Sequence, residues 1–210
     1  ACAPFRRLSL CNKNFQNINN IDSDKARHNL LADVCLAAKY EGQSIKTHLE
    51  KYDALYEGSG HTTCTALARS FADIGDIIRG RDLYRRDKGE ETKLENNLKT
   101  IFAKIHSEVT KTNGKAAKER YKDDGGNYFQ LREDWWTANR ATVWKALTCD
   151  APEGASYFRA TCSERNGGCS QANHYCRRGN DQPGNDKPNI DPPTYFDYVP
   201  QYLRWFEEWA

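Results

Sequence analysis

The chain has no long apolar run, and this absence limits what the protein can be. No segment approaches the roughly 18 consecutive apolar residues that a membrane-spanning helix needs, so we predict no transmembrane helix. Methionine is also absent, and the first residues show no signal-peptide pattern. We therefore expect the 210 residues to be a piece of a longer protein.

Hydrophobic residues are scarce as well. They make up 38% of the chain, and the mean hydropathy of −0.89 is low for a globular protein. The eleven Tyr, eight Phe and five Trp residues nevertheless argue against disorder. A chain of this length can bury a substantial core, so we predict a folded protein with few, large core residues and a charged exterior.

An excess of one charge sign is missing too. The 31 Lys and Arg residues are nearly balanced by 29 Asp and Glu residues, which leaves a net charge of +2. Such a chain has no overall field that would draw it to nucleic acid or to a membrane surface, so we expect no nucleic-acid partner. An anionic partner would have to be recognised by a local cluster of basic residues.

The motifs of common catalytic sites are absent from the sequence. There is no P-loop, no H-E-x-x-H and no G-x-S-x-G, and the five histidines are scattered. The paired carboxylates Asp73 and Asp76, and Glu207 and Glu208, are expected on solvated helix faces. We therefore predict no catalytic residues, no cofactor and no enzymatic activity.

Cysteines are present in an even number, in two clusters that are typical of an exported protein with disulfides. Because no C-x-x-C pair occurs, a zinc site built from Cys162, Cys169, His174 and Cys176 is the weaker alternative, and we predict no metal. The pairing is left open, since eight cysteines allow many connectivities. The predicted disulfide cysteines are Cys2, Cys11, Cys35, Cys64, Cys149, Cys162, Cys169 and Cys176.

Most of the chain shows the 3.6-residue periodicity of amphipathic helices. The predicted helices cover about 22–42, 44–58, 62–80, 90–111, 131–149 and the aromatic C-terminal segment. Gly42 is expected to end the first helix, and Gly75, inside the third, predicts a close helix–helix approach. Trp136 and Trp144 are predicted to be structural. The cleanest apolar stripe consists of Leu94, Leu98, Ile101, Phe102, Ile105 and Val109.

Two segments lack this periodicity. Residues 1–21 are predicted to form an irregular arm held by cysteines, and residues 150–193, rich in Gly, Asn, Asp and Pro, a long surface loop. Alternation with a period of two residues occurs nowhere at length. The predicted fold class is mostly α: a disulfide-stapled helical bundle with an irregular N-terminal arm and a long cysteine-containing loop.

Two clusters of basic residues flank the helix predicted over 90–111. Arginine forks match planar anionic oxygens and each contact releases counterions, so these clusters could bind sulfated glycans. The alternative is a solvated helix end, which Lys and Arg also favour. The candidate glycan-binding residues are Arg79, Arg81, Arg85, Arg86, Lys88, Lys111, Lys115, Lys118, Arg120 and Lys122.

The chain ends on an aromatic segment, residues 192–210. A stripe at three- and four-residue spacings predicts a helix that lines a core, and Pro200 is expected to kink or delay that helix. Trp205 and Trp209 lie on an adjoining face of this helix. We predict that these two rings are exposed in this chain and form the contact with a further subdomain. The stripe consists of Tyr195, Tyr198, Val199, Tyr202, Leu203 and Phe206.

Several segments resemble the conserved blocks of a known family. The three longest are LARSFADIGDIIRG (67–80), REDWWTANRATVWKALTC (132–149) and PTYFDYVPQYLRWFEEWA (193–210). Together with CAPFRRLSLC (2–11) and LLADVCLAAKYEG (30–42), they resemble the Duffy-binding-like domain, alpha class, of Plasmodium falciparum erythrocyte membrane protein 1. The resemblance spans the whole chain.

The resemblance implies a non-enzymatic, extracellular adhesion module on the surface of the infected erythrocyte, in a membrane-anchored protein. The family is implicated in cytoadherence and rosetting, with host red-cell or endothelial receptors, sulfated glycosaminoglycans such as heparan sulfate, blood-group sugars and antibodies as partners. The alternative is a structural and antigenic head segment whose neighbouring domains bind the receptor.

The family fold implies three disulfide-linked subdomains. Residues 1–21 would belong to the first, residues 22–210 would form the helical second, and an adjacent third would begin beyond Ala210. Family members often have a Cys-Arg-Cys unit where Cys176 is followed here by Arg177 and Arg178, so disulfide pairings are not carried over.

Overall fold

The computed structural model describes residues 2–15, 26–55, 63–84, 93–112, 114–122, 124–155, 161–162, 169–170, 172–178 and 192–210. Within these ranges the chain is mostly helical, as predicted. The long helices are α2 (Ala26–Leu55), α3 (Thr63–Arg79), α4 (Lys93–Thr112) and α6 (Phe129–Leu147). The short ones are α1 (Phe5–Leu8), α5 (Gly114–Arg120), η4 (Gly125–Asn127), η5 (Phe196–Tyr198) and α7 (Gln201–Trp209). In this described part, no helix combines the length and apolar character needed to cross a membrane.

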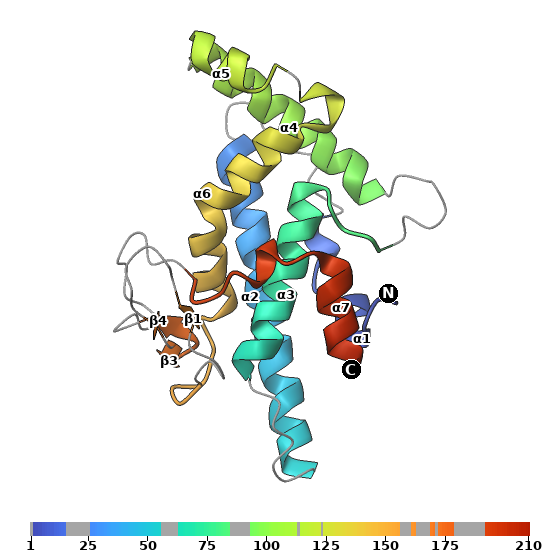
Figure 1. Cartoon of the computed structure of the whole chain (residues 1–210), viewed down its shortest axis with the longest axis vertical. Helices are drawn as coiled ribbons and strands as arrows, with labels where there is room; N and C mark the ends of the chain where they lie inside the picture. The colour runs from blue at the N-terminus through green and yellow to red at the C-terminus, as the bar shows by residue number, and fades with distance from the viewer. Residues whose placement is uncertain are drawn as a thin grey trace.

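Helices α2, α3 and α6 pack side by side and form the central bundle (Figure 1). Its core is aromatic: the ring of Phe71 lies 5.1 Å, centroid to centroid, from both Trp136 and Trp144. Both tryptophans are buried, which confirms their predicted place in the core.

Gly75 marks the close contact between α3 and α6. A Cβ atom at this position would lie 2.8 Å from Cζ2 of Trp136, closer than a real Cβ can approach. The prediction that this glycine permits a close helix–helix approach is confirmed.

Gly42 does not end a helix, contrary to the prediction. Helix α2 continues through it for 30 residues in all, so the two helices predicted over this region are one. A Cβ atom on Gly42 would lie 2.0 Å from the carbonyl oxygen of Leu147 at the end of α6. The glycine is therefore required for backbone contact between α2 and α6.

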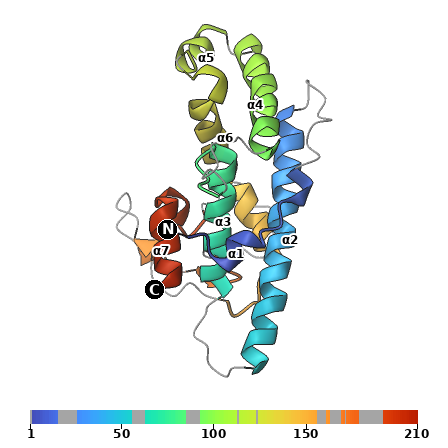
Figure 2. The ribbon, with the colours of Figure 1, turned by 90° about the vertical axis from the view of Figure 1, so that its right-hand side faces the viewer.

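Helices α4 and α5 extend the molecule beyond one end of the bundle (Figures 1 and 2). The ring of Phe102 meets Trp135 of α6 edge-on, with centroids 6.3 Å apart. The predicted stripe of α4 faces inward: Leu94 and Val109 are partly buried, and the fully buried members are Leu98, Ile101, Phe102 and Ile105.

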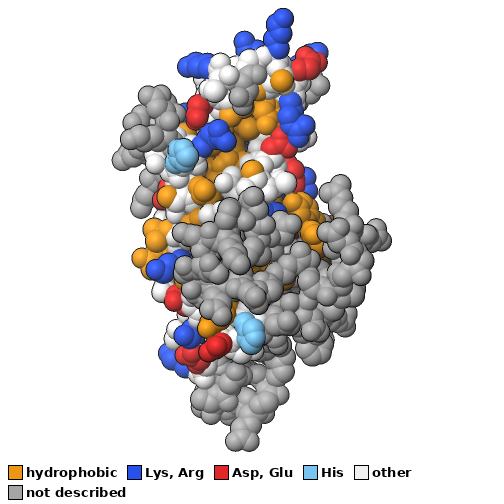
Figure 3. All heavy atoms as spheres, turned by 90° about the vertical axis from the view of Figure 1, so that its left-hand side faces the viewer, with side chains coloured by type: hydrophobic (Ala, Val, Ile, Leu, Met, Phe, Trp, Pro, Cys, Tyr) orange, Lys and Arg blue, Asp and Glu red, His pale blue; other side chains and the backbone are white. Residues whose placement is uncertain are grey.

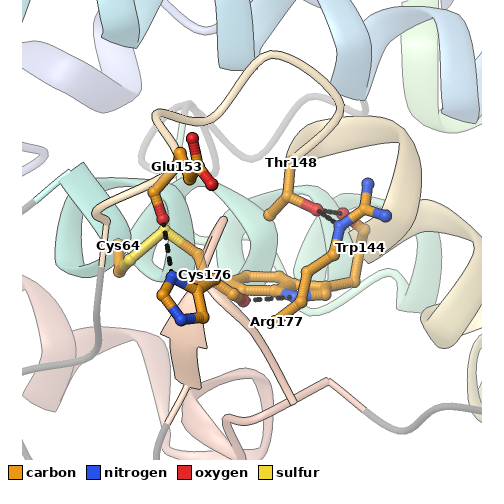
Figure 4. The surroundings of a disulfide bond; sticks show 7 residues. Cys64, Trp144, Thr148, Glu153, Cys176 and Arg177 are labelled. Atoms are coloured by element: carbon orange, nitrogen blue, oxygen red, sulfur yellow. Dashed lines mark hydrogen bonds between the residues drawn. A yellow bond between two sulfur atoms is a disulfide. The ribbon is translucent and has the colours of Figure 1, made fainter. Parts of the chain in front are cut away.

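A disulfide between Cys64 and Cys176 ties the start of α3 to residues 172–178. The indole Nε1 of Trp144 donates to the carbonyl oxygen of Cys176 (3.0 Å), and Arg177 Nε donates to Thr148 Oγ1 (2.9 Å) (Figure 4). The segment is thus fixed to the start of α3 by a covalent bond and to the C-terminal end of α6 by hydrogen bonds.

The region predicted as a loop, residues 150–193, contains short strands. They are β1 (Thr161–Cys162), β2 (Cys169–Ser170), β3 (Ala172–His174) and β4 (Arg177–Arg178). The strands pair antiparallel as β1 with β2 and β3 with β4, and the backbone of Cys162 lies opposite that of Cys169. The side chains of these two cysteines lie outside the described part, so their predicted bridging stays a prediction.

The remaining cysteines differ from the expectation that all eight form disulfides. Cys2, Cys11, Cys35 and Cys149 are free thiols in the structure. A disulfide requires two Cα atoms roughly 4.4–6.8 Å apart, a condition that a cysteine count cannot test. Burial raises the pKa of both the Cys11 and the Cys35 thiols to about 11.

The C-terminal segment shows the largest difference from the sequence prediction. Helix α7 begins after Pro200, so the predicted delay is confirmed, but its orientation is the reverse of that expected. The buried residues of α7 are Gln201, Arg204 and Trp205. The stripe predicted to line the core is exposed instead, and the exposed large side chains are Tyr195, Tyr198, Val199, Tyr202, Leu203, Phe206 and Trp209.

Candidate functional site

Two surfaces of the described chain are suited to binding a partner. The first, which we call the basic end, consists of Lys111, Lys115, Lys118, Arg120 and Lys122 around α4 and α5. The second, the terminal face, consists of the exposed apolar side chains of α1, η5 and α7, namely Phe5, Leu8, Tyr195, Tyr198, Val199, Tyr202, Leu203, Phe206 and Trp209. Buried charges set the orientation of the second surface and are described first.

Asp73 of α3 binds the polar face of α7. Its Oδ1 accepts hydrogen bonds from Gln201 Nε2 (3.2 Å), Arg204 Nη2 (2.9 Å) and Trp205 Nε1 (3.2 Å). Burial alone would raise the pKa of Asp73, but the Arg6 and Arg204 guanidinium groups lower it below its ordinary value. The three donors are the three buried residues of α7, so one carboxylate determines which face of that helix turns inward.

Asp76 lies one turn further along α3 and binds the same arginine. Arg204 Nη2 lies 2.5 Å from Asp76 Oδ2, and Arg79 Nη2 lies 3.0 Å from Oδ1. Burial raises the pKa of Asp76 to about 6, against the opposing effect of the two arginines. The prediction that Asp73 and Asp76 lie on a solvated face is therefore wrong, because α3 is buried on nearly all sides from Cys64 to Arg79.

Helix α1 joins this charge cluster from the other end of the chain. Arg6 donates to Asp73 Oδ2 (2.7 Å) and, through Nε and Nη2, to both carboxylate oxygens of Glu208 (2.9 and 2.8 Å). The ring of Phe5 packs edge-on against Trp209, with centroids 5.8 Å apart. The two ends of the chain thus lie side by side (Figure 2).

A second buried ion pair positions η5. Arg140 donates to both oxygens of Asp197 (2.8 and 2.9 Å), and Trp136 Nε1 donates to Asp197 Oδ2 (2.9 Å). The Arg140 guanidinium lies over the rings of Tyr195 and Tyr198, 5.6 and 5.3 Å from their centroids. These contacts hold both tyrosines at the surface, beside α7.

Sequence reasoning missed these buried anchors. One signal was available: Asp73, Asp76 and Arg79 are spaced three residues apart in a segment whose other residues are mostly apolar, so no solvated face remained for them. Their partners on α7, Gln201 and Arg204, are at least 128 residues away in the sequence and could not be found from local patterns.

The structure divides the first basic cluster. Arg79 is buried, where its Nε donates to the carbonyl oxygen of Gly75 (3.0 Å) and its Nη2 to the carbonyl oxygen of Asp197, so it has no exposed group for a glycan. Arg81 is 59% exposed and forms an ion pair with Glu133 (2.8 Å). The remaining members, which lie outside the described residues, are Arg85, Arg86 and Lys88.

The second basic cluster lies together at the basic end. Lys111 is at the end of α4, Lys115 and Lys118 are on α5, and these lysines are exposed. Arg120 is held by Asp134 through two contacts of 2.5 and 2.7 Å, and Lys122 lies 3.9 Å from Glu119. Figure 3 shows Lys and Arg side chains gathered over this end of the molecule.

The zinc alternative does not fit Cys176, because its sulfur is bonded to Cys64 and cannot act as a thiolate ligand. Over the described ranges, no group of three or more His, Cys, Asp and Glu side chains could hold a metal ion. The chemistry that the two surfaces offer is binding: ammonium and guanidinium groups for anions at the basic end, and aromatic rings for apolar or planar groups at the terminal face.

Comparison with known proteins shows the family. The family model of the Duffy binding domain matches residues 1–204. The NTS-DBL1(alpha-1) domain of Plasmodium falciparum membrane protein 1 (PfEMP1), varO strain, is 43% identical with a TM-score of 0.77, and the match covers 100% of this chain and 43% of that one. The NTS-DBL1-alpha and CIDR-gamma double domain of the same strain is also 43% identical, with a TM-score of 0.74 and coverage of 100% and 27%.

A third structure, a DBLb domain of PfEMP1 bound to human ICAM-1, is 34% identical with a TM-score of 0.63 over 97% of this chain and 38% of that one. No curated protein matches the chain. The chain spans less than half the length of these solved relatives. Because the family model covers nearly every element described above, and a solved relative is 43% identical over the whole chain, this protein belongs to the Duffy binding domain family.

Proposed function

We propose that the chain is an extracellular adhesion module of a variant antigen on infected erythrocytes. It binds host red-cell or endothelial receptors and glycans in cytoadherence and rosetting, and it is exposed to antibodies. The proposal is supported by family membership and by a DBLb relative solved in complex with human ICAM-1. The two exposed surfaces of the described chain are available to such partners.

The basic end is the observation on which the glycan part of the proposal depends. Lys111 at the end of α4, Lys115 and Lys118 on α5 and Lys122 just after α5 are exposed, while Arg120 is fixed by Asp134. Closely spaced ammonium groups bind the sulfates of a glycosaminoglycan and release its counterions. We also propose the remaining residues of the first basic cluster, Arg81, Arg85, Arg86 and Lys88, as glycan contacts, and leave out Arg79 because it is buried.

Retention on immobilised heparin across a salt gradient tests this site. The triple variant K111Q/K115Q/K118Q should elute at lower salt, and the slope of log affinity against log salt should fall by about one unit for each lost contact. The matched control is K13Q/K46Q/K51Q, which removes the same charge from the arm and from α2, where Lys13 and Lys51 are exposed and Lys46 is partly exposed. If the two triple variants elute together, the basic end is not a glycan site.

A second candidate function is structural. The chain covers 43% of a solved relative, and the terminal face displays aromatic rings that are costly to leave in water. We propose that a third subdomain on the same polypeptide packs against this face, and in this alternative the neighbouring domains bind the receptor. A longer chain should then show slower hydrogen exchange over 201–209 and bind cells that the 210-residue chain does not bind; unchanged exchange would contradict the packing.

A further inference from the structure

Asp73 is shared by the two ends of the chain. Its Oδ1 accepts three hydrogen bonds from α7, and its Oδ2 accepts one from Arg6 of α1 (2.7 Å). The carboxylate is fully buried. Helices α1 and α7, joined directly by Arg6 and Glu208 at a sequence separation of 202 residues, therefore use the same anion.

Apart from Trp205, neither terminal helix buries a large apolar side chain. Of the four residues of α1 only Arg7 is buried, and α7 buries Gln201, Arg204 and Trp205. Hydrophobic burial is the usual driving force for helix docking, and here most of it is replaced by hydrogen bonds and ion pairs to α3. The docking of both helices depends on the charges around Asp73.

This cluster contains three carboxylates, those of Asp73, Asp76 and Glu208. It also contains three guanidinium groups, those of Arg6, Arg79 and Arg204, so its charges balance when both helices are in place. Asp73 and Asp76 of α3 are two buried carboxylates on one helix, and Arg204 of α7 contacts both of them (2.9 and 2.5 Å). Arg6 of α1 supplies a further positive charge to Asp73 and also neutralises Glu208 of α7. A buried carboxylate that loses its partner is strongly destabilising, so removal of Arg6 weakens the site on which α7 docks.

A second route connects the same two helices. Arg7 of α1 lies 2.5 Å from Asp82 Oδ2, and Gln201 of α7 donates to Asp82 Oδ1 (2.8 Å) as well as to Asp73. Asp82 follows α3, so each terminal helix again reaches the other through a carboxylate of the central segment. Gln201 belongs to both routes.

We propose that Asp73 makes the docking of α1 and α7 cooperative, so that the two helices form one clasp that opens and closes as a unit. Phe5 of α1 and Trp209 of α7 then meet only in the closed clasp, whereas the η5 part of the terminal face is held separately by Arg140. Any event that displaces the N-terminal arm loosens α7, and any contact that holds α7 stabilises the arm. The clasp is independent of which ligand the protein binds.

Hydrogen exchange measured by mass spectrometry on the 210-residue chain tests the clasp. R6Q, which removes a guanidinium from α1, should accelerate exchange over residues 201–209 by roughly tenfold, the scale expected for loss of a charge-assisted hydrogen bond. R120Q is the matched control, since it also removes an arginine that makes two contacts with one carboxylate, at the other end of the molecule. It should leave 201–209 unchanged.

A double variant distinguishes cooperative docking of α1 and α7 from independent contacts of each helix with Asp73. Arg6 and Gln201 meet different oxygens of Asp73. In the clasp the exchange rates over 201–209 in R6Q/Q201A rise by less than the product of the two single effects, because both side chains bind the Asp73 carboxylate and the loss of one weakens the contact of the other. If R6Q does not fold, E208Q, which cuts the direct link and adds no buried charge, should accelerate both 2–15 and 201–209. Multiplicative effects, or acceleration confined to the helix that carries the substitution, would overturn the proposal.

Discussion

Trp136 is the residue at which the helical core meets the polar anchors. Its ring fills the space above Gly75 and packs against Phe71, while its Nε1 donates to Asp197 at 2.9 Å. It therefore links α6 to α3 by packing and to η5 by a hydrogen bond, and these interactions give it a structural role.

Replacement of this residue gives the first prediction. W136A should lower the free energy of unfolding by about 3–5 kcal/mol, because it leaves a large cavity and removes one hydrogen bond from the buried Asp197 carboxylate. F206A, at a position that is 71% exposed, should change it by less than about 0.5 kcal/mol. Urea unfolding followed by fluorescence measures both, and equal losses for the two variants would contradict the structural role of Trp136.

Cysteine reactivity gives the second prediction. The thiolate is the reactive form, and burial raises the pKa of Cys35 to about 11, so at pH 8 this thiol stays protonated. Iodoacetamide at pH 8 should modify the exposed Cys2 quickly and Cys35 slowly, and the rate at Cys35 should increase as the pH approaches 11. After unfolding without a reductant, mass spectrometry should find Cys2, Cys11, Cys35 and Cys149 alkylated. If these four cysteines are not alkylated, they are bridged by disulfides.

Helix α7 shows, at the scale of one element, where reasoning from sequence stops. Periodicity identifies which residues share a helix face, and it correctly predicted that Leu98, Ile101 and Phe102 of α4 turn inward together. It does not identify which of two faces turns inward. In α7 that choice is made by Asp73 and Asp76, whose burial was itself hidden because paired carboxylates are usually solvated.

In the other elements too, local sequence patterns predict some features, while others depend on partners that are distant in the sequence. Gly75 can be interpreted from sequence because a mid-helix glycine usually marks close packing, whereas the pattern around Gly42 fits a helix end equally well, since glycine serves both purposes. The basic end could be predicted as an exposed cluster, but Arg79 could not be separated from its neighbours until its internal partners were known.

The disulfide of residues 172–178 gives a prediction at this scale. C64S/C176S should lower the free energy of unfolding by about 2–4 kcal/mol, since the bridge closes a loop across a sequence separation of 112 and restricts the unfolded chain. C149S, which removes an unbridged thiol, is the control and should cost less than about 1 kcal/mol. Urea unfolding under non-reducing conditions compares them, and similar losses would show that the bridge adds no stability.

At the scale of the whole molecule, the basic end and the terminal face are separate surfaces. The basic end lies beyond one end of the bundle, and the terminal face lies where the two chain ends meet (Figures 1 and 2). A polyanionic glycan at the first therefore leaves the second free for a protein neighbour. This separation allows glycan binding and domain packing to be tested independently, the first by salt and the second by hydrogen exchange.

Binding of the labelled 210-residue chain to intact human erythrocytes and endothelial cells, measured by flow cytometry, tests the adhesion role most directly. We predict saturable binding that soluble heparin competes away and that K111Q/K115Q/K118Q weakens, while K13Q/K46Q/K51Q binds like the unmodified chain. A correctly folded chain that shows no saturable binding to either cell type would contradict the adhesion role and favour the structural head segment.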